Sequence, residues 1–271
     1  MKYRSVGIVL ATLGMCLAAQ GRDVYVLRVL GMPLPQPDGQ TVTWLDALVF
    51  HNSRTADATI SVLGTSNGVQ LANPVAVMVP AGSTRTSPDL DWTPANQAVP
   101  LYVLHLAVPD GVSVLSRIGP EVYAGCGVDV CGPTSPGLVL LPVFSVLTPP
   151  GAEQLLLGTD LGSSPVRLNG AFYNGGAIPA NCSAEVRSVC DDHVFASYQF
   201  TVPANQVIQV NGLGPIDDSC PSPPGGIPYG AGWAYGRVIM DQPGFSYVSV
   251  QQNGALPALG LAIAAIPGAV Q

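Results

Sequence analysis

Short runs of alternating apolar and polar residues fill most of the chain after its first 20 residues. Residues 42–51 (VTWLDALVFH), 166–174 (VRLNGAFYN) and 194–202 (VFASYQFTV) are clear examples. A period of two places the apolar side chains on one face of a strand. Turn-forming Gly, Pro, Asn and Asp separate the runs, and no run longer than about ten residues keeps the 3.6-residue period of a helix. The pattern therefore predicts an all-β chain.

The same pattern predicts where the individual strands lie. They are expected at residues 23–30, 42–51, 58–63, 74–79, 101–107, 112–118, 138–147, 166–174, 181–189, 194–202, 206–210, 233–240, 245–250 and 259–266. Residues 33–39 and 149–165 are predicted to be loops. Residues 109–111 and 241–244 are predicted to be hairpin turns between neighbouring strands.

One β unit is written twice along the chain. Phe50-His51-Asn52 matches Phe172-Tyr173-Asn174, and Val79-Pro80-Ala81-Gly82 matches Val202-Pro203-Ala204-Asn205. Residues 109–112 similarly match residues 243–245. We therefore predict two tandem antiparallel β-sandwich domains of the immunoglobulin-like type, at residues 22–118 and 138–271. A Cys/Gly/Pro-rich linker, residues 119–137, joins them. One fused two-sheet body is the alternative.

The N-terminus predicts export. Lys2 and Arg4 precede an apolar run at residues 6–19, and Ala19-Gln20-Gly21 offers small residues for cleavage. This arrangement is typical of a signal peptide, here residues 1–21. The run is shorter than the roughly 20 residues of a membrane-spanning helix. A lipoprotein signal ending at Cys16 is the alternative, although Met15 fits it poorly. We expect a secreted protein, extracellular or on the outer cell surface.

The charge balance narrows the range of partners. The chain carries a net charge of −7, and Lys2 is its only lysine. Such a chain is a poor partner for nucleic acid and for anionic membranes. We expect no nucleic-acid partner and no membrane span. The expected partners are a protein or a glycan at the cell surface, or a second copy joined through an edge strand.

Cysteine spacing predicts a disulfide framework, because export favours disulfides. Cys126 and Cys131 flank a short turn and are predicted to bridge locally. Cys190 and Cys220 form the second predicted bridge. Cys182 and Cys190 lie on one predicted strand, too far apart along it to pair, so Cys182 is predicted to be buried and free. The spacings match no zinc site, and we expect no metal or other cofactor.

A resemblance follows from these motifs. Residues 44–52 (WLDALVFHN), the Val-Pro-Ala corner and residues 241–253 (DQPGFSYVSVQQN) resemble repeated β-sandwich domains in secreted proteins of acidobacteria and related bacteria. The resemblance covers most of the mature chain and implies a structural repeat. That family has no established activity and no agreed catalytic residues, so none is implied here. The insertion at residues 212–232 departs from the family's usual repeat.

Candidate chemical groups are few. His51 and His105 lie inside predicted strands, and the chain has no Gly-x-Ser-x-Gly elbow for a nucleophilic serine. Asp191-Asp192-His193 is the only dense cluster with a histidine. It predicts a solvated turn, with a cation or sugar contact as the alternative. The close carboxylate pairs, Asp89 with Asp91 and Asp217 with Asp218, lie in Pro-rich loops. We expect both pairs to be hydrated turn residues. The alternative for either pair is glycoside hydrolysis, and a further alternative for the second pair is calcium binding.

Three aromatic residues are the candidate ligand contacts. Trp92, Trp233 and Tyr229 flank the two long loops, and aromatic rings stack on sugars. Core packing is the alternative for each tryptophan. We expect a structural or adhesive protein and not an enzyme. The alternatives are a carbohydrate-binding module, a hydrolase, and a strand-exchanging subunit of an extracellular assembly. In the last case residues 259–266 are either donated to another copy or close their own sheet.

Overall fold

The computed structural model describes a set of segments that covers most of the chain. These are residues 21–29, 32–35, 41–71, 76–86, 92, 101–121, 139–160, 166–188, 191–211, 233–252 and 261–267. All their regular structure is β, as predicted, and all the strand pairs are antiparallel. None of these residues forms a helix with the length and apolar character that a membrane crossing requires.

The first half of the molecule, residues 22–144, contains two five-stranded sheets. One has the order β10-β1-β7-β4-β5, and the other has β2-β3-β8-β9 with β6 beside β3. The strands are β1 (Arg22–Val29), β2 (Met32–Pro35), β3 (Thr41–Asn52), β4 (Ala58–Thr65), β5 (Val77–Val79), β6 (Thr84–Thr86), β7 (Leu101–Val108), β8 (Val112–Glu121), β9 (Val139–Leu141) and β10 (Val143–Phe144).

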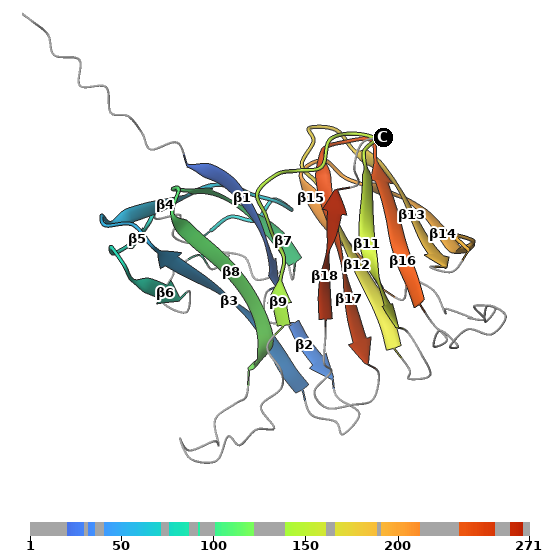
Figure 1. Cartoon of the computed structure of the whole chain (residues 1–271), viewed down its shortest axis with the longest axis horizontal. Helices are drawn as coiled ribbons and strands as arrows, with labels where there is room; N and C mark the ends of the chain where they lie inside the picture. Colours follow the sequence, from blue (N-terminus) through green and yellow to red (C-terminus); the bar gives the residue numbers. More distant parts are fainter. Residues whose placement is uncertain are drawn as a thin grey trace, which may run out of the picture.

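The second half, residues 153–267, contains one eight-stranded sheet in the order β14-β13-β16-β11-β18-β17-β12-β15. Its strands are β11 (Glu153–Asp160), β12 (Val166–Asn174), β13 (Ala180–Ser188), β14 (Val194–Val202), β15 (Gln206–Asn211), β16 (Trp233–Met240), β17 (Gly244–Gln252) and β18 (Leu261–Pro267). The two halves lie side by side in Figure 1.

The two halves share one strand order. The run β14-β13-β16-β11 matches β5-β4-β7-β1, and β15-β12-β17-β18 matches β6-β3-β8-β9. The second half differs because β18 pairs with β11 as well as with β17, which joins its two runs into one sheet. The sequence repeat is therefore a repeat of topology. The predicted strand at residues 259–266 closes its own sheet as β18.

A buried asparagine fixes the same corner in each half. The Asn52 side-chain amide donates to the carbonyls of Ala56 at 2.9 Å, Val79 at 2.9 Å and Pro80 at 3.2 Å. The Asn174 amide donates to the matched carbonyls of Ile178 at 2.8 Å, Val202 at 3.0 Å and Pro203 at 3.2 Å. Both side chains are fully buried. Backbone carbonyls that would otherwise lack partners are thus satisfied in both copies.

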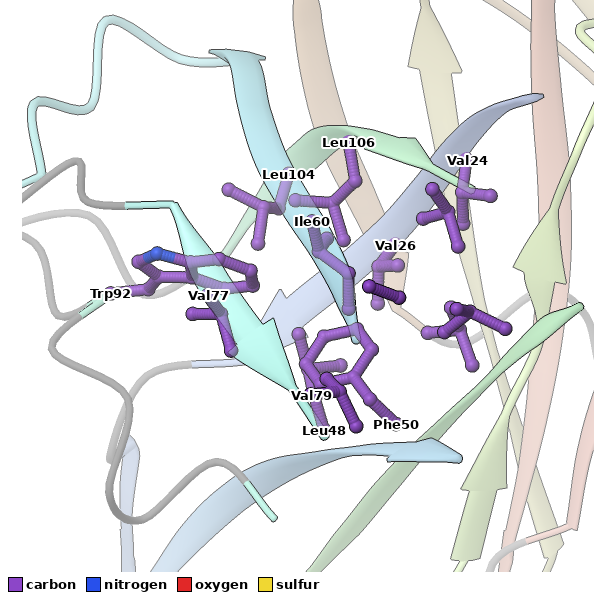
Figure 2. Close-up of a cluster of buried hydrophobic side chains, with 14 of the residues drawn as sticks. Val24, Val26, Leu48, Phe50, Ile60, Val77, Val79, Trp92, Leu104 and Leu106 are labelled. Atoms are coloured by element: carbon purple, nitrogen blue, oxygen red, sulfur yellow. The ribbon is translucent and has the colours of Figure 1, made fainter. Parts of the chain in front are cut away.

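Each half has its own apolar core. In the first half, alternate residues of facing strands meet around Phe50 and Trp92, as Figure 2 shows. In the second half, Phe172, Cys182, Val202 and Met240 are among the buried members. This is the inward-facing half of the period-two pattern read from the sequence.

A third apolar cluster joins the halves. It takes Leu27, Leu101, Val103 and Leu141 from the first half, and Ala171, Tyr173, Val207, Phe245 and Tyr247 from the second. Apart from Leu141, which is on β9, these side chains lie on the outer face of the β1–β7 sheet and on the outer face of β12, β15 and β17. The Phe144 and Phe245 rings stack with centroids 3.9 Å apart. The two repeated halves therefore share a continuous apolar contact.

One strand prediction and two loop predictions need correction. Residues 138–147 do not begin the second copy, because β9 pairs with β8 and β10 pairs with β1 of the first half. The counterpart of β1 is β11, which lies in the segment predicted to be a loop at residues 149–165. Residues 33–39 were also predicted to be a loop, but β2 covers Met32–Pro35 and pairs with β3. Its prolines fit there because β2 lies at a sheet edge.

Candidate functional site

The three histidines lie apart. His51, on β3, is exposed and its Nδ1 lies 3.0 Å from the Thr84 hydroxyl. His105, on β7, stacks on Tyr25 with ring centroids 4.3 Å apart and lies 3.6 Å from an Asp23 carboxylate oxygen. These two residues belong to different sheets of the first half, and His193 lies in the second half. No histidine shares a site with another.

The predicted Asp191-Asp192-His193 cluster forms the turn between β13 and β14. Asp192 has a φ of 62°, and its amide donates to the Ser188 carbonyl at 3.1 Å. Asp191 lies 2.6 Å from His193 Nδ1. Asp192 accepts a hydrogen bond from the Tyr235 hydroxyl. All three turn residues are exposed, so the arrangement is the solvated turn that the sequence favoured.

The charges around this turn satisfy one another. Arg187 lies 2.8 Å from a Glu185 oxygen and 3.1 Å from an Asp192 oxygen. The hydrogen bond from Tyr235, and then that from Arg187, lowers the pKa of Asp192. Hydrogen bonding to His193 lowers the pKa of Asp191. Both carboxyls therefore stay ionised well below neutral pH and are poorly suited to act as general acids there.

Metal ligands do not gather in the described part of the chain. Its segments contain no group of three or more His, Cys, Asp or Glu side chains placed to hold a metal ion. Asp191 and Asp192 have the oxygen ligands that Ca²⁺ prefers. Their partners in the structure are instead His193, Tyr235 and Arg187.

Trp92 lies in the core of the first half. It is 1% exposed, and its ring meets that of Phe50 edge to face with centroids 5.8 Å apart. Phe200 and Phe172 make the matching contact in the second half, at 4.7 Å. The Trp92 ring, proposed from sequence as a ligand contact, thus fills a packing position. Of the other two aromatic candidates, Trp233 begins β16, while Tyr229 lies outside the described residues.

Cys182 is a buried free thiol on β13, as predicted. It is 2% exposed. Burial, with a smaller contribution from the Asp241 charge, raises the pKa of the thiol to about 12. A thiol that stays protonated is a poor nucleophile and metal ligand. The remaining predicted disulfide cysteines, Cys126, Cys131, Cys190 and Cys220, lie outside the described residues, as do Asp89, Asp91, Asp217 and Asp218.

Sequence reasoning missed a polar clasp between the halves, formed by Asn67 and Asn205. The Asn67 side chain accepts from the Val207 amide at 2.7 Å and donates to the Leu101 carbonyl at 2.8 Å. Asn205 donates to the Thr65 carbonyl at 3.1 Å. Both asparagines have positive φ, 57° and 50°. Asn next to Gly in Thr65–Gly68 signalled a turn, but nothing in the sequence named its partner.

The sheet edges of the two halves differ. β5, at the edge of the first half, has three residues, whereas its counterpart β14 has nine. Arg85 donates from its guanidinium to the Met78 carbonyl of β5 at 2.8 Å. Register places Ile208 in the second half at the position of Arg85, since both lie opposite the matched Phe172 and Phe50. At this matched position β14 therefore has an isoleucine beside it in place of a cation.

Comparison of the chain with protein-family models, with curated proteins and with solved structures gives no match. The function of the chain is therefore inferred from its own geometry.

Proposed function

We propose that the protein is a secreted or cell-surface structural or adhesive protein without catalytic activity, built from two tandem immunoglobulin-like sandwiches. The observation that carries the proposal is the apolar contact between the halves. Tyr173, Phe245 and Tyr247 are each less than 10% exposed there. A contact of this kind holds two units in one orientation, whereas sparsely packed units joined by a linker move independently.

The placement of the polar groups supports the same proposal. Each histidine has a nearby structural partner: Thr84 for His51, Asp23 for His105 and Asp191 for His193. Asn52 and Asn174 hold corners, and Asn67 and Asn205 hold the halves together. These polar side chains are engaged in contacts that maintain the fold, and the fully buried Asn52 and Asn174 have their hydrogen bonds satisfied, as a structural or adhesive module requires. The export signal predicted at residues 1–21 supports a role outside the cell.

The test is to express the full chain in a bacterial host and fractionate the cells. We expect the protein outside the cytoplasm with a mature N-terminus close to Arg22, measured by intact mass and N-terminal sequencing. The purified mature chain, coated on beads, should increase their retention on cells or on extracellular matrix. It should remain inactive on panels of glycoside, ester and peptide substrates. Cytoplasmic retention with residues 1–21 intact, or turnover of any substrate class, would contradict the proposal.

A further inference from the structure

In the part of the chain that the structure describes, β14 is an unpaired and uncharged sheet edge. Within the described part of the chain it pairs with β13 alone, and it forms one end of the eight-stranded sheet, as Figure 1 shows. Its nine residues, VFASYQFTV, include no charged residue and no proline. Natural edge strands are usually short, charged, interrupted by proline or covered, because an open edge offers unpaired backbone groups to another chain.

The first half shows what a protected edge looks like in the same fold. β5 is three residues long, and Arg85 occupies the Met78 carbonyl. In the second half that position carries Ile208, which packs against the core. The edge strand of the first half, β5, is therefore short and partly protected by Arg85. The edge strand of the second half, β14, is long and has Ile208 at the position of that arginine.

Two aromatic residues of β14 are only partly covered. Tyr198 and Phe200 point toward the core of the second half and pack against it without being fully buried. Phe200 meets Phe172 edge to face at 4.7 Å. A further strand beside β14 would cover the remaining surface of both rings, since side chains of adjacent strands on one face lie in contact.

We propose that β14 pairs antiparallel with β14 of a second copy, about a two-fold axis at Gln199. Gln199 is the midpoint of residues 196–202, which pair regularly with β13, whereas a bulge interrupts the pairing at Phe195. In this register Tyr198 lies opposite Phe200 of the other copy, and Ser197 lies opposite Thr201. Aromatic pairs and hydroxyl pairs are among the favourable cross-strand combinations. A two-fold axis makes each pair occur twice.

Electrostatics permit this self-pairing despite the negative charge of the chain. The paired strands carry no charge, so no like charges face each other across the new ladder. The nearest charges on β13, Glu185 and Arg187, lie on the outer face and form an ion pair with each other at 2.8 Å. Arg187 also compensates Asp192 at the turn. A second copy is therefore a suitable occupant, and the inference does not depend on the adhesive role proposed above.

The test uses charge at the two-fold position of the mature full-length chain. Gln199 is exposed, so Gln199→Lys and Gln199→Glu should leave the fold intact. The matched control is Met78→Lys, at the exposed position on the protected edge of the first half. Molar mass is measured by sedimentation velocity from about 1 to 100 μM, where small interfaces associate. Circular dichroism checks that each variant is folded.

We expect a concentration-dependent dimer for the unaltered chain and for Met78→Lys. Each Gln199 variant alone should dimerise roughly tenfold more weakly, because like charges then face each other. An equimolar mixture of the Lys and Glu variants should restore the dimer. A monomeric unaltered chain throughout this range, or a dimer insensitive to Gln199→Lys, would overturn the proposal. Weakened variants that mixing does not rescue would show that this edge binds in another register or takes another occupant, which also overturns it.

Discussion

The same sheet face has opposite chemistry in the two halves. Register gives three matched pairs of outward-facing positions: Tyr173 with His51, Phe245 with Ser113, and Tyr247 with Leu115. In the second half all three are buried against the first half. In the first half His51 and Ser113 are exposed and Leu115 is 54% exposed. The inward face is apolar in both copies, because both copies need a core. The polarity of the outer face instead depends on whether the other half covers it.

The outer face of the β1–β7 sheet and the matching face of β11 and β16 have similar chemistry in the two halves. Asp23 and His105 of the first half match Glu153 and Arg237 of the second, and each pair lies across one β-ladder. The first pair is 3.6 Å apart beside the apolar cluster, and the second pair is 2.9 Å apart and partly exposed. Both copies therefore have a polar pair at this position. The pair of the first half lies beside the apolar contact between the halves, whereas the pair of the second half does not.

The largest effect on stability should come from a substitution that places a first-half residue at the matching buried position of the second half. Phe245→Ser removes a 1% exposed ring that stacks on Phe144 and lies 5.0 Å from Tyr173. We expect a loss of about 4 kcal/mol in the free energy of unfolding, measured in denaturant. The reciprocal Ser113→Phe, at an exposed position, should change it by less than about 0.5 kcal/mol. Equal effects of the two substitutions would remove the basis of the comparison.

The next largest effect should be shared by both halves. Asn52→Ala and Asn174→Ala each leave buried carbonyls at the Val-Pro corner without a donor. We expect each to cost about 3 kcal/mol in unfolding free energy. Asn181→Ala is the control, because the one side-chain hydrogen bond that it removes, from Nδ2 to Asp241, is exposed, and it should cost less than about 1 kcal/mol. A large cost in only one half would mean that the corners are not equivalent.

A smaller effect should come from exchanging the corner residues themselves. Asn205 has a φ of 50° where the first half has Gly82 with a φ of 63°. Asn205→Gly keeps the turn but removes the bonds to Thr65 and from the Tyr173 hydroxyl, so we expect a loss of about 1 kcal/mol. The amide hydrogen-exchange rates of residues at the contact between the halves should increase more than those elsewhere in the chain. Gly82→Asn should leave that contact's exchange rates unchanged.

The smallest expected effect is on the stability of the fold at low pH. Hydrogen bonding lowers the pKa of Asp191 and Asp192 in the folded chain below its ordinary value near 3.8. A lowered folded pKa stabilises the fold above the unfolded pKa, and the stabilisation is lost as pH falls through the folded pKa. We expect Asp192→Asn to flatten the dependence of the melting temperature on pH below about 4 and to change it little at pH 7. An unchanged acid slope would show that the turn contributes nothing.

The sequence predicts alternation well and connectivity poorly. The period-two runs of β14 and β16 coincide with the predicted segments because a half-buried strand requires that pattern. β11 (EQLLLGTD) was missed because its apolar residues are consecutive and prolines precede and follow it. Trp92 could not be placed from sequence, since it lies outside the regular strands and still packs beside Phe50. The clasp of Asn67 and Asn205 depends on how the halves meet, which no local pattern encodes.

The contact between the halves has a direction. The β1–β7 face of the first half meets the β12–β17 face of the second half, so the contact joins two different surfaces of the repeat. Contacts of this kind propagate along an axis unless something ends them. The corresponding faces away from this contact are polar, with the ion pair of Arg237 and Glu153 in the second half and the exposed His51 and Ser113 in the first. The two units therefore meet through two different faces of the same repeat.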